Sequence, residues 1–542
     1  MVTGLNSLHD CLMTILVKYD INEEIVLTYS QHKDFDVQCN NLVKYSQNQN
    51  INNIKKEILD SVEKINNIKN CEFSDNLFIN FELDEAYFEQ TLLSLPLPKR
   101  NESILFDYGG PNIGKALHVG HLRTLNIGRA LYNINKFVGN KVISDIHLGD
   151  WGMPVALIIA YIENQNLDIK TILANELEHI YPESNKMAST NIEFYETAKN
   201  ISTKLNNKDP EYIEKWKIIY NLSVDEIKNT LSRLNHEFDY FYGESDVVEE
   251  SSKVLEIAKN KKLTNENQGA IVSSEDVDPP IILVKSDGSY LYLTTDLGTV
   301  LFREKNFDID KYLYVVDQRQ SNHFSQVFST VKHFNLSSKE FFHISYGTVN
   351  GKDGKPLKTR DGGTYKLEDL YSDTYNFLEK NNDDTKTLEC LTNSVLTYSD
   401  LLPNRKINYQ FDIEKFTDIN GKTAIYLQYA QVRAKKLMEE GTDIKQVKNI
   451  SELNNNERDL AFLLTKFPYF LLLSLDRHEP HHLAEYAYDL SKSFNTFYTN
   501  NKIFSSNVLS NDKEKRLFLV RKFYKVINDV FFCLGITPVD EM

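Results

Sequence analysis

A strand–turn–helix–strand pattern between residues 104 and 146 constrains the fold most strongly. The apolar run Ile104–Tyr108 ends in a Gly-Gly-Pro-Asn turn, and a long helical periodicity follows over Leu117–Phe137. A second apolar run, Lys141–Ile146, comes next. This order is typical of a βαβ unit, in which the two strands are parallel and ligands bind at their carboxyl ends. We therefore predict an α/β fold with a doubly wound, Rossmann-like parallel sheet.

The same sheet is predicted to continue after a largely helical insertion at about 154–262. Apolar runs that alternate with helical stretches return at Ile281–Val284, Leu291–Leu293, Tyr312–Val316 and Phe342–Tyr346. They are interpreted as the second half of one nucleotide-binding sheet. We assign residues 99–370 to this domain.

Two further domains are predicted on either side of it. Residues 1–98 indicate an α+β domain that ends at a Pro-Leu-Pro break. Its predicted elements are a helix around Leu8–Leu16, a helix through Lys69, a strand at Leu77–Phe81 and a helix at Asp84–Leu95. Residues 371–542 indicate an α-helical bundle, with helices near Asp373–Lys380, Lys386–Leu402, Lys422–Glu440, Glu457–Leu473, His482–Tyr498 and Asn511–Leu534.

Cysteine usage and hydropathy indicate the cellular setting. None of the five cysteines has the spacing of a zinc knuckle or a redox pair, and an odd number argues against a disulfide framework. The N-terminus has no signal-peptide pattern. The most apolar segment, Phe462–Leu475, is interrupted by Lys466 and Pro468 and is too short to span a bilayer. We expect a cytoplasmic protein with no membrane partner and no resident metal, and we interpret His481-His482 as a helix start.

The strongest local signal for chemistry is His118-Val119-Gly120-His121, at the start of the predicted long helix. Two imidazoles three residues apart share one face of the first turn, where unpaired N–H groups and the helix dipole favour a phosphate. Gly120 leaves space for a flat adenine ring. The pattern alone is nearly as compatible with a structural role, but its place after a strand and a Gly-rich turn favours nucleotide binding.

A second segment, Gly351–Gly363, has four basic residues and four glycines in thirteen positions. This composition indicates a mobile, positively charged loop that could close over a pyrophosphate leaving group. A solvated hairpin tip is the alternative. The helix that begins at His118 is predicted to belong to the same parallel-sheet domain, and this favours the phosphate-binding interpretation.

Several motifs resemble those of the class I aminoacyl-tRNA synthetases, in the arginyl form. They are Phe106–Arg123, His147–Gly152, Gly243–Ser245, Tyr292–Asp296, Asp317–Gln320, Leu427–Ala430 and the tail Leu534–Met542. The matches extend from the strand at Leu77 to the last residue, and together they are highly specific.

This resemblance implies arginyl-tRNA synthetase activity, in which ATP and L-arginine form arginyl-adenylate, and the arginyl group then passes to the 3′ adenosine of tRNA(Arg). It implies Mg²⁺ with ATP, a monomer, and arginine activation that needs bound tRNA. The three segments become an N-terminal tRNA-binding domain, a class I catalytic domain and an anticodon-binding domain. The alternatives are an RNA-binding paralogue that charges nothing and an adenylate-forming ligase for a small molecule.

The resemblance also assigns roles to residues around the nucleotide. His118, Gly120 and His121 would hold ATP, and the two imidazoles would stabilise charge on the transferring phosphate. The sequence Pro356–Arg360 replaces the usual Lys-Met-Ser-Lys-Ser signature, and Lys115 lies where other arginyl enzymes are thought to compensate for the missing cation. The remaining loop candidates are Lys358 and Arg360 for catalysis and Lys355 and Thr359 for ATP binding.

Recognition of arginine can be argued from its chemistry. A guanidinium is planar with five donors, so a specific pocket needs a fixed carboxylate and neutral acceptors. By resemblance, Tyr292 and Asp296 would bind the guanidinium. Without the resemblance, Asp296 would be interpreted as a helix N-terminal residue that the helix dipole stabilises. The other candidates are Asn112 and Gln320 for the α-amino and carboxylate groups, and Asp107 and Glu244 for further polar contacts.

The charge distribution suggests where tRNA would bind. The net charge is −16, but residues 421–542 carry 17 Lys/Arg against 15 Asp/Glu and are slightly basic. The basic residues concentrate on the last predicted helix, where contacts with anticodon-stem phosphates are expected. The tRNA-binding candidates are Lys515, Arg516, Arg521 and Lys522 on this helix, and Gln428 in the Leu-Gln-Tyr-Ala motif.

Overall fold

The computed structural model describes residues 4–30, 32–274, 281–286, 290–351, 354, 355, 357, 365–380, 384–442, 450 and 452–542. The chain divides into two compact units. One is Arg100–Phe416, and the other combines the two chain ends, Met1–Lys99 and Thr417–Met542. Among the helices of the described residues, none has both the length and the apolar character needed to cross a membrane.

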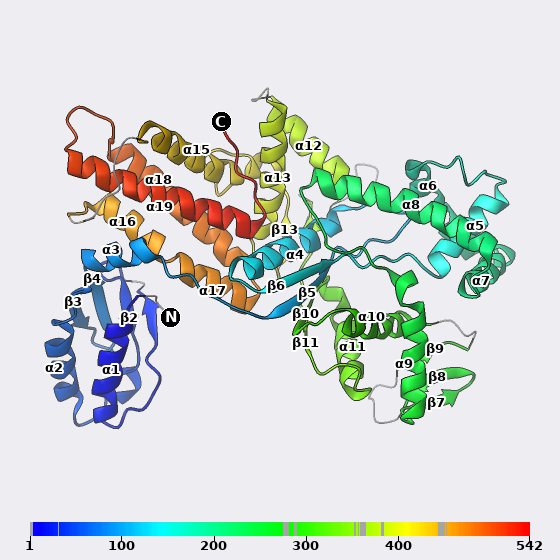
Figure 1. The fold of residues 1–542 in the computed structure, drawn as a ribbon, viewed down its shortest axis with the longest axis horizontal. Helices are drawn as coiled ribbons and strands as arrows, with labels where there is room; N and C mark the ends of the chain where they lie inside the picture. The colour runs from blue at the N-terminus through cyan, green and yellow to red at the C-terminus, as the bar shows by residue number, and fades with distance from the viewer. Residues whose placement is uncertain are drawn as a thin grey trace. The chain divides into compact units, whose positions relative to one another are not determined.

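The unit Arg100–Phe416 contains a four-stranded parallel sheet with the order β11-β10-β5-β6 (Figure 1). Helix α4 (Val119–Phe137) connects β5 to β6, and the chain later returns on the other side of β5, so the strand order reverses between β5 and β10. The predicted α/β class with a doubly wound sheet is confirmed. The strands are β5 (Ser103–Tyr108), β6 (Lys141–Asp145), β10 (Lys311–Val315) and β11 (Glu340–His343).

One predicted strand of this sheet lies in another sheet. The segment at 281–284 forms β9 (Ile282–Val284), which pairs in an antiparallel three-stranded sheet with β8 (Ala270–Ser273) and β7 (Thr264–Asn267).

The predicted strand Leu291–Leu293 is wrong, because helix α10 (Tyr292–Asn306) begins there. Leu293, Leu297 and Val300 follow a helical spacing and are buried in a cluster with side chains of α9. The remaining elements of this unit are η2 (Glu244–Val247), α9 (Val248–Asn260), η3 (Gln318–Gln320), α11 (Ser321–His333), β12 (Val349–Asn350), α12 (Leu367–Glu379), α13 (Thr385–Leu401), β13 (Tyr409–Gln410) and α14 (Ile413–Phe416).

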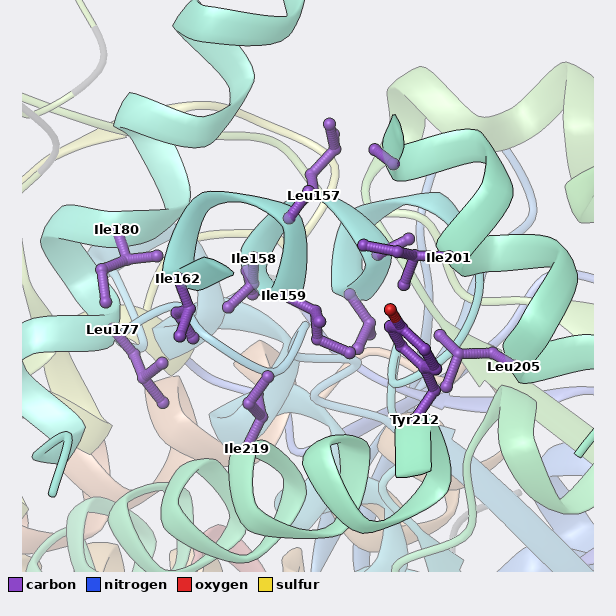
Figure 2. Close-up of a cluster of buried hydrophobic side chains, with 14 of the residues drawn as sticks. Leu157, Ile158, Ile159, Ile162, Leu177, Ile180, Ile201, Leu205, Tyr212 and Ile219 are labelled. Carbon is purple, nitrogen blue, oxygen red and sulfur yellow. The ribbon is translucent and has the colours of Figure 1, made fainter. Parts of the chain in front are cut away.

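The helical insertion has its own hydrophobic core, formed around α5 (Figure 2). Its first four helices are α5 (Met153–Asn164), α6 (Ala174–Thr190), α7 (Ile192–Asn206) and α8 (Pro210–Arg233). Leu177 and Ile180 of α6 face Ile158 and Ile162 of α5 in this core. The same cluster includes Ile113, which lies in the turn after β5. The core of the insertion is therefore continuous with the turn that leads into α4.

A buried cation links α10 to the parallel sheet. The Nη2 atom of Arg303 donates to Asp107 of β5 at 2.7 Å and to Asp145 of β6 at 2.6 Å. Its Nη1 atom donates to the Tyr314 hydroxyl of β10 at 3.2 Å. Arg303 is completely buried. One guanidinium thus joins a helix to three neighbouring strands.

The second unit begins with a four-stranded antiparallel sheet of order β1-β2-β4-β3. The predicted helix through Lys69 ends at Val62, and a strand follows it. The elements are α1 (Asn6–Lys18), β1 (Leu27–Tyr29), β2 (Val37–Cys39), η1 (Val43–Tyr45), α2 (Ile51–Val62), β3 (Ile68–Phe73), β4 (Ile79–Leu83) and α3 (Glu85–Ser94).

The C-terminal part of this unit is helical. Its helices are α15 (Ala424–Glu440), α16 (Asn455–Thr465), α17 (Phe467–Arg477), α18 (His481–Asn500) and α19 (Ser510–Leu534). The single helix predicted over Glu457–Leu473 is divided in two, because Pro468 in the first turn of α17 has no N–H to continue the preceding helix.

The structure places the start of this helical part later than residue 371. Both α12 and α13 contact α4 and belong to the unit that contains the parallel sheet. The buried side chains of Arg123 in α4 and Asp400 in α13 form an ion pair at 3.1 Å. This packing moves the boundary from 371 to the residue after Phe416.

We expect Arg303→Met to lower the free energy of unfolding by about 3–5 kcal/mol, because it leaves two carboxylates buried without their cation. Urea unfolding followed by circular dichroism measures this loss. Lys305→Met, two residues away on the same helix and 66% exposed, is the control and should change stability by less than about 0.5 kcal/mol. Equal effects of the two substitutions would contradict the importance of the buried cation.

Candidate active site

The candidate site lies at the carboxyl ends of β5 and β10, where the strand order reverses. After β5 the chain turns through Gly109, which has a φ of 97° and where a Cβ would lie 2.8 Å from Cγ1 of Ile146. The Ile113 N–H then donates to the Gly149 carbonyl at 3.1 Å. This bond joins the turn after β5 to the turn after β6 and fixes the approach to α4.

His118 and His121 form a reciprocal cap at the start of α4. Nδ1 of His118 accepts from the Gly120 N–H at 3.0 Å, and Nδ1 of His121 accepts from the His118 N–H at 3.0 Å. Because each Nδ1 is an acceptor, the network assigns the proton of each neutral ring to Nε2. A Cβ at Gly120 would lie 2.8 Å from Cε1 of His118, so glycine is needed to seat this imidazole.

Burial and a nearby cation keep both imidazoles neutral. Burial lowers the pKa of His121 to about 3, with smaller contributions from His118 and Lys115. Burial, followed by Lys115, also lowers the pKa of His118. Neutral rings that present Nε2–H can stabilise negative charge by hydrogen bonding, but they are poor proton sources at neutral pH. The arrangement is suited to electrostatic stabilisation of a phosphate.

The chain that follows the charged loop, the segment Gly351–Gly363, pairs with the segment that enters α4. The Val119 N–H donates to the Tyr365 carbonyl at 3.0 Å, and the Leu367 N–H donates to the Leu117 carbonyl at 2.9 Å. At the loop's other end, the Gly351 N–H donates to the Lys355 carbonyl at 2.8 Å. The candidates Lys358, Thr359 and Arg360 lie outside the described residues.

Acidic side chains gather where η2 and α10 begin. Burial, followed by Asp150 and Asp296, raises the pKa of Glu244 to about 8. The Oδ2 atom of Asp296 lies 2.5 Å from Nε2 of His323 on α11, and this bond raises the pKa of His323. Asp150 is completely buried and accepts from the Ser245 N–H at 2.9 Å and from its hydroxyl at 2.5 Å. This end of the sheet is therefore rich in acidic side chains.

The other candidates for arginine binding occupy different environments. Tyr292, the first residue of α10, is 70% exposed. Asn112, in the turn after β5, and Gln320, the last residue of η3 after β10, are also exposed. Asp107 is instead paired internally with Arg303. Its charge is therefore balanced within the sheet, and a ligand contact for Asp107 stays a prediction.

The sequence analysis did not identify the side chains that bind Asp107, Asp296 and Asp150. Arg303, His323 and Ser245 hold Asp107, Asp296 and Asp150 respectively. Arg303 and His323 come from other elements than their partners, so a local motif does not reveal the pairing. Ser245 lies inside the Gly-Glu-Ser motif that the sequence did single out, but its partner is 95 residues away.

Comparison with known families decides what kind of site this is. The profile for the catalytic domain of class I (R) tRNA synthetases matches residues 82–413, and the profile for the DALR anticodon binding domain matches residues 427–542. The chain belongs to the class I arginyl-tRNA synthetases.

Individual relatives agree with this assignment over the full length. An arginine–tRNA ligase of Francisella tularensis subsp. holarctica is 32% identical, and the alignment covers 99% of each chain. Two solved arginyl-tRNA synthetases have the same fold. The Plasmodium falciparum structure has a TM-score of 0.80 at 24% identity over 99% of each chain. The Thermus thermophilus structure has a TM-score of 0.82 at 19% identity over 100% of each chain.

In the part of the chain that matches the anticodon-binding family, Gln428 is internal. It is completely buried, its Nε2 donates to the Thr537 carbonyl at 2.7 Å, and its Oε1 accepts from the Val539 N–H at 3.1 Å. Gln428 therefore holds the C-terminal tail, and the structure contradicts a direct tRNA contact for it.

Two predicted phosphate contacts on α19 are engaged in ion pairs within the protein. Lys515 is 3% exposed and pairs with Glu457 at 3.1 Å, and Arg516 donates to the same carboxylate at 2.7 Å. Both cations neutralise a buried acid of α16. Burial of Lys515 argues against a tRNA contact there, whereas Arg516 is partly exposed and its tRNA contact stays a prediction. Arg521 and Lys522 are partly exposed, and their role stays a prediction.

The start of α18 at His481 confirms the interpretation of His481-His482 as a helix start. Glu479, His481 and His482 are nevertheless a group of the described residues that could hold a metal ion, since their ligand atoms lie within 4.8 Å of one another. Nε2 of His482 is 3.3 Å from the Glu479 carboxylate.

We expect His121→Asn to flatten the dependence of stability on pH between about 6.5 and 5, because asparagine can supply an acceptor in place of Nδ1 but does not titrate. A histidine with a lowered pKa binds fewer protons in the folded state, so its contribution is present above the unfolded value of about 6.5 and is lost as pH falls. Between pH 7.5 and pH 5, the unmodified protein should lose up to about 2 kcal/mol more than the variant in urea unfolding. Parallel losses in the two proteins would contradict the neutral, buried state of His121.

Proposed function

We propose that this chain activates L-arginine with ATP to form arginyl-adenylate and then transfers the arginyl group to the 3′ adenosine of tRNA(Arg). One observation carries this proposal. The capped turn His118–His121 is suited to a phosphate, and the acidic side chains of Glu244 and Asp296 are suited to a guanidinium. Both groups belong to the same end of one parallel sheet.

ATP would bind with its phosphates at the start of α4. His118 and His121 would donate from Nε2 to the transferring phosphate, while Lys115 would supply a nearby positive charge. The loop candidates Lys355, Lys358, Thr359 and Arg360 would act on the leaving pyrophosphate. Mg²⁺ would enter as the counterion of the triphosphate, since the residues of the turn are imidazoles and a lysine rather than the oxygen ligands that Mg²⁺ prefers.

Arginine would bind between η2 and α10. Asp296, oriented by His323, and Tyr292 would receive the guanidinium, and Glu244 would add a second carboxylate. Asn112 and Gln320 would orient the α-amino and carboxylate groups. The exposed positions of Tyr292, Asn112 and Gln320 are compatible with contact to a ligand.

The partner tRNA(Arg) would contact the N-terminal domain and the DALR domain, with Arg516, Arg521 and Lys522 as the remaining candidates on α19. We propose a cytoplasmic monomer whose arginine activation requires bound tRNA. The match of residues 427–542 to an anticodon-binding family supports the tRNA partner.

Exchange of labelled pyrophosphate into ATP, measured with each amino acid and with or without tRNA, tests this function. We expect exchange with arginine alone among the amino acids, and only in the presence of tRNA(Arg). A complete lack of arginine-dependent exchange with tRNA present would favour an RNA-binding protein without activity. Rapid exchange with another amino acid would instead indicate a different ligase.

We expect arginine binding to release nearly one proton at pH 7, because Glu244, with a pKa of about 8, is mostly protonated when the site is empty. A bound guanidinium favours the carboxylate, so the apparent affinity for arginine should rise as pH increases from 6 toward 8. Titration calorimetry in buffers with different ionisation enthalpies measures the proton.

Glu244→Gln is the matched control for this release, since glutamine keeps the shape but has no proton to lose. Its binding enthalpy should not depend on the buffer. If the unmodified chain also binds arginine without buffer dependence, Glu244 does not contribute a titrating carboxylate to the pocket.

A further inference from the structure

Helix α6 of the insertion presents two side chains toward the segments that flank the histidine turn. Leu177 and Ile180 are buried in the core of the insertion, which anchors the helix (Figure 2). Glu178 and Tyr181 each follow one of these residues, so they share a neighbouring face, three positions apart. Both are partly buried, and each contacts a lysine outside the insertion.

Glu178 holds the chain where it leaves the charged loop. Its carboxylate forms an ion pair with the Nζ atom of Lys366. Lys366 is bridged to His118 through the backbone, and the next residue donates its N–H to the Leu117 carbonyl at 2.9 Å. The pair therefore ties α6 to the short segment around Lys366 that pairs with the start of α4.

Tyr181 holds the cation that precedes the histidine turn. The Nζ atom of Lys115 lies 4.2 Å from the centroid of the Tyr181 ring. A Cβ on Gly114 would lie 3.6 Å from Cδ2 of the same ring, so the Tyr181 ring also lies near the backbone that precedes Lys115. A neutral ring attracts an ammonium without cancelling its charge, whereas a carboxylate would pair with it.

The need for such a neutral partner follows from the surrounding acids. Glu178, Glu226 and Glu368 line one small pocket together with Lys115 and Lys366. Burial, followed by Glu368 and Glu178, raises the pKa of Glu226. An unrestrained Lys115 could turn toward these carboxylates and away from the nucleotide.

We propose that Glu178 and Tyr181 are positioning residues of the adenylation site, through which the helical insertion holds Lys115 and the exit of the charged loop in place for ATP. This inference rests on the proposed function and extends it to the insertion. Tyr181 acts through Lys115 and keeps its full charge available. Glu178 acts through Lys366 and fixes the loop exit beside His118.

Pyrophosphate exchange with saturating tRNA tests the two residues. We expect Tyr181→Leu to lower the kcat of exchange about fivefold to tenfold, and Tyr181→Phe, which keeps the ring, to retain it. Glu178→Gln should raise the KM for ATP about fivefold and leave the KM for arginine unchanged. Lys115→Ala removes the cation itself and should cost about 10²-fold.

A double variant separates positioning from mere stability. If Tyr181 acts through Lys115, adding Tyr181→Leu to Lys115→Ala should cause no further loss. The control is Glu183→Gln on the same helix, whose side chain is 55% exposed, and it should behave as the unmodified chain does. Thermal unfolding of each variant shows whether the helix still folds.

Three outcomes would overturn the proposal: additive losses in the double variant, equal losses for Tyr181→Phe and Tyr181→Leu, or values for Glu178→Gln that match those of Glu183→Gln. These outcomes differ from failure of the proposed function, which would appear as no arginine-dependent exchange by the unmodified chain. That result would remove the positioning role as well.

Discussion

The guanidinium of Arg303 is the contact on which the geometry of the site depends. It is completely buried, and it binds side chains at the ends of β5, β6 and β10 from the helix that begins at Tyr292. A planar cation with several donors can satisfy two carboxylates and a hydroxyl at once, which a lysine cannot do with the same geometry. Removal of one charged partner would leave a buried charge uncompensated, so the cluster of four side chains depends on all its charged members. Arg303 therefore fixes the position of helix α10, which carries Asp296, relative to the strand ends that lead to the His118–His121 turn.

A second constraint joins the parallel sheet to the helical insertion. Ile113 is 1% exposed and belongs to the hydrophobic cluster of α5–α8, although it lies between Asn112 and the Gly114-Lys115 pair of the turn. Close packing transmits small displacements, so a shift of α6 would move the backbone that carries these polar residues. The insertion thus shares its core with the catalytic turn, and contacts such as Tyr181 with Lys115 extend a connection that apolar packing already makes.

The sequence was sufficient for those parts of the fold whose signals are local. The βαβ unit and the long C-terminal helices have clear periodicities, and the structure contains them. Leu291–Leu293 was misassigned because a short apolar run has no distinctive period, and here burial against α9 made it helical. Motifs named the acidic residues of the proposed arginine site, but their positions depend on long-range partners such as His323 and Arg303, which no spacing indicates. Lys515 and Arg516 show the same limit, because only the fold reveals that α16 brings Glu457 between them.

The distribution of partners among the acids suggests how the proposed pocket selects its ligand. Asp107 is paired with Arg303, Asp150 accepts two hydrogen bonds from Ser245, and Asp296 is held by His323. Glu244 is repelled by Asp150 and Asp296, and this repulsion adds to its burial in raising its pKa. A cationic ligand relieves that repulsion, whereas a neutral side chain of the same shape leaves it in place. A lysine side chain would supply the charge but not the planar set of donors, so it would leave some of the acceptors without a partner. Charge would exclude neutral amino acids and geometry would exclude lysine, which together favour arginine without a separate editing site.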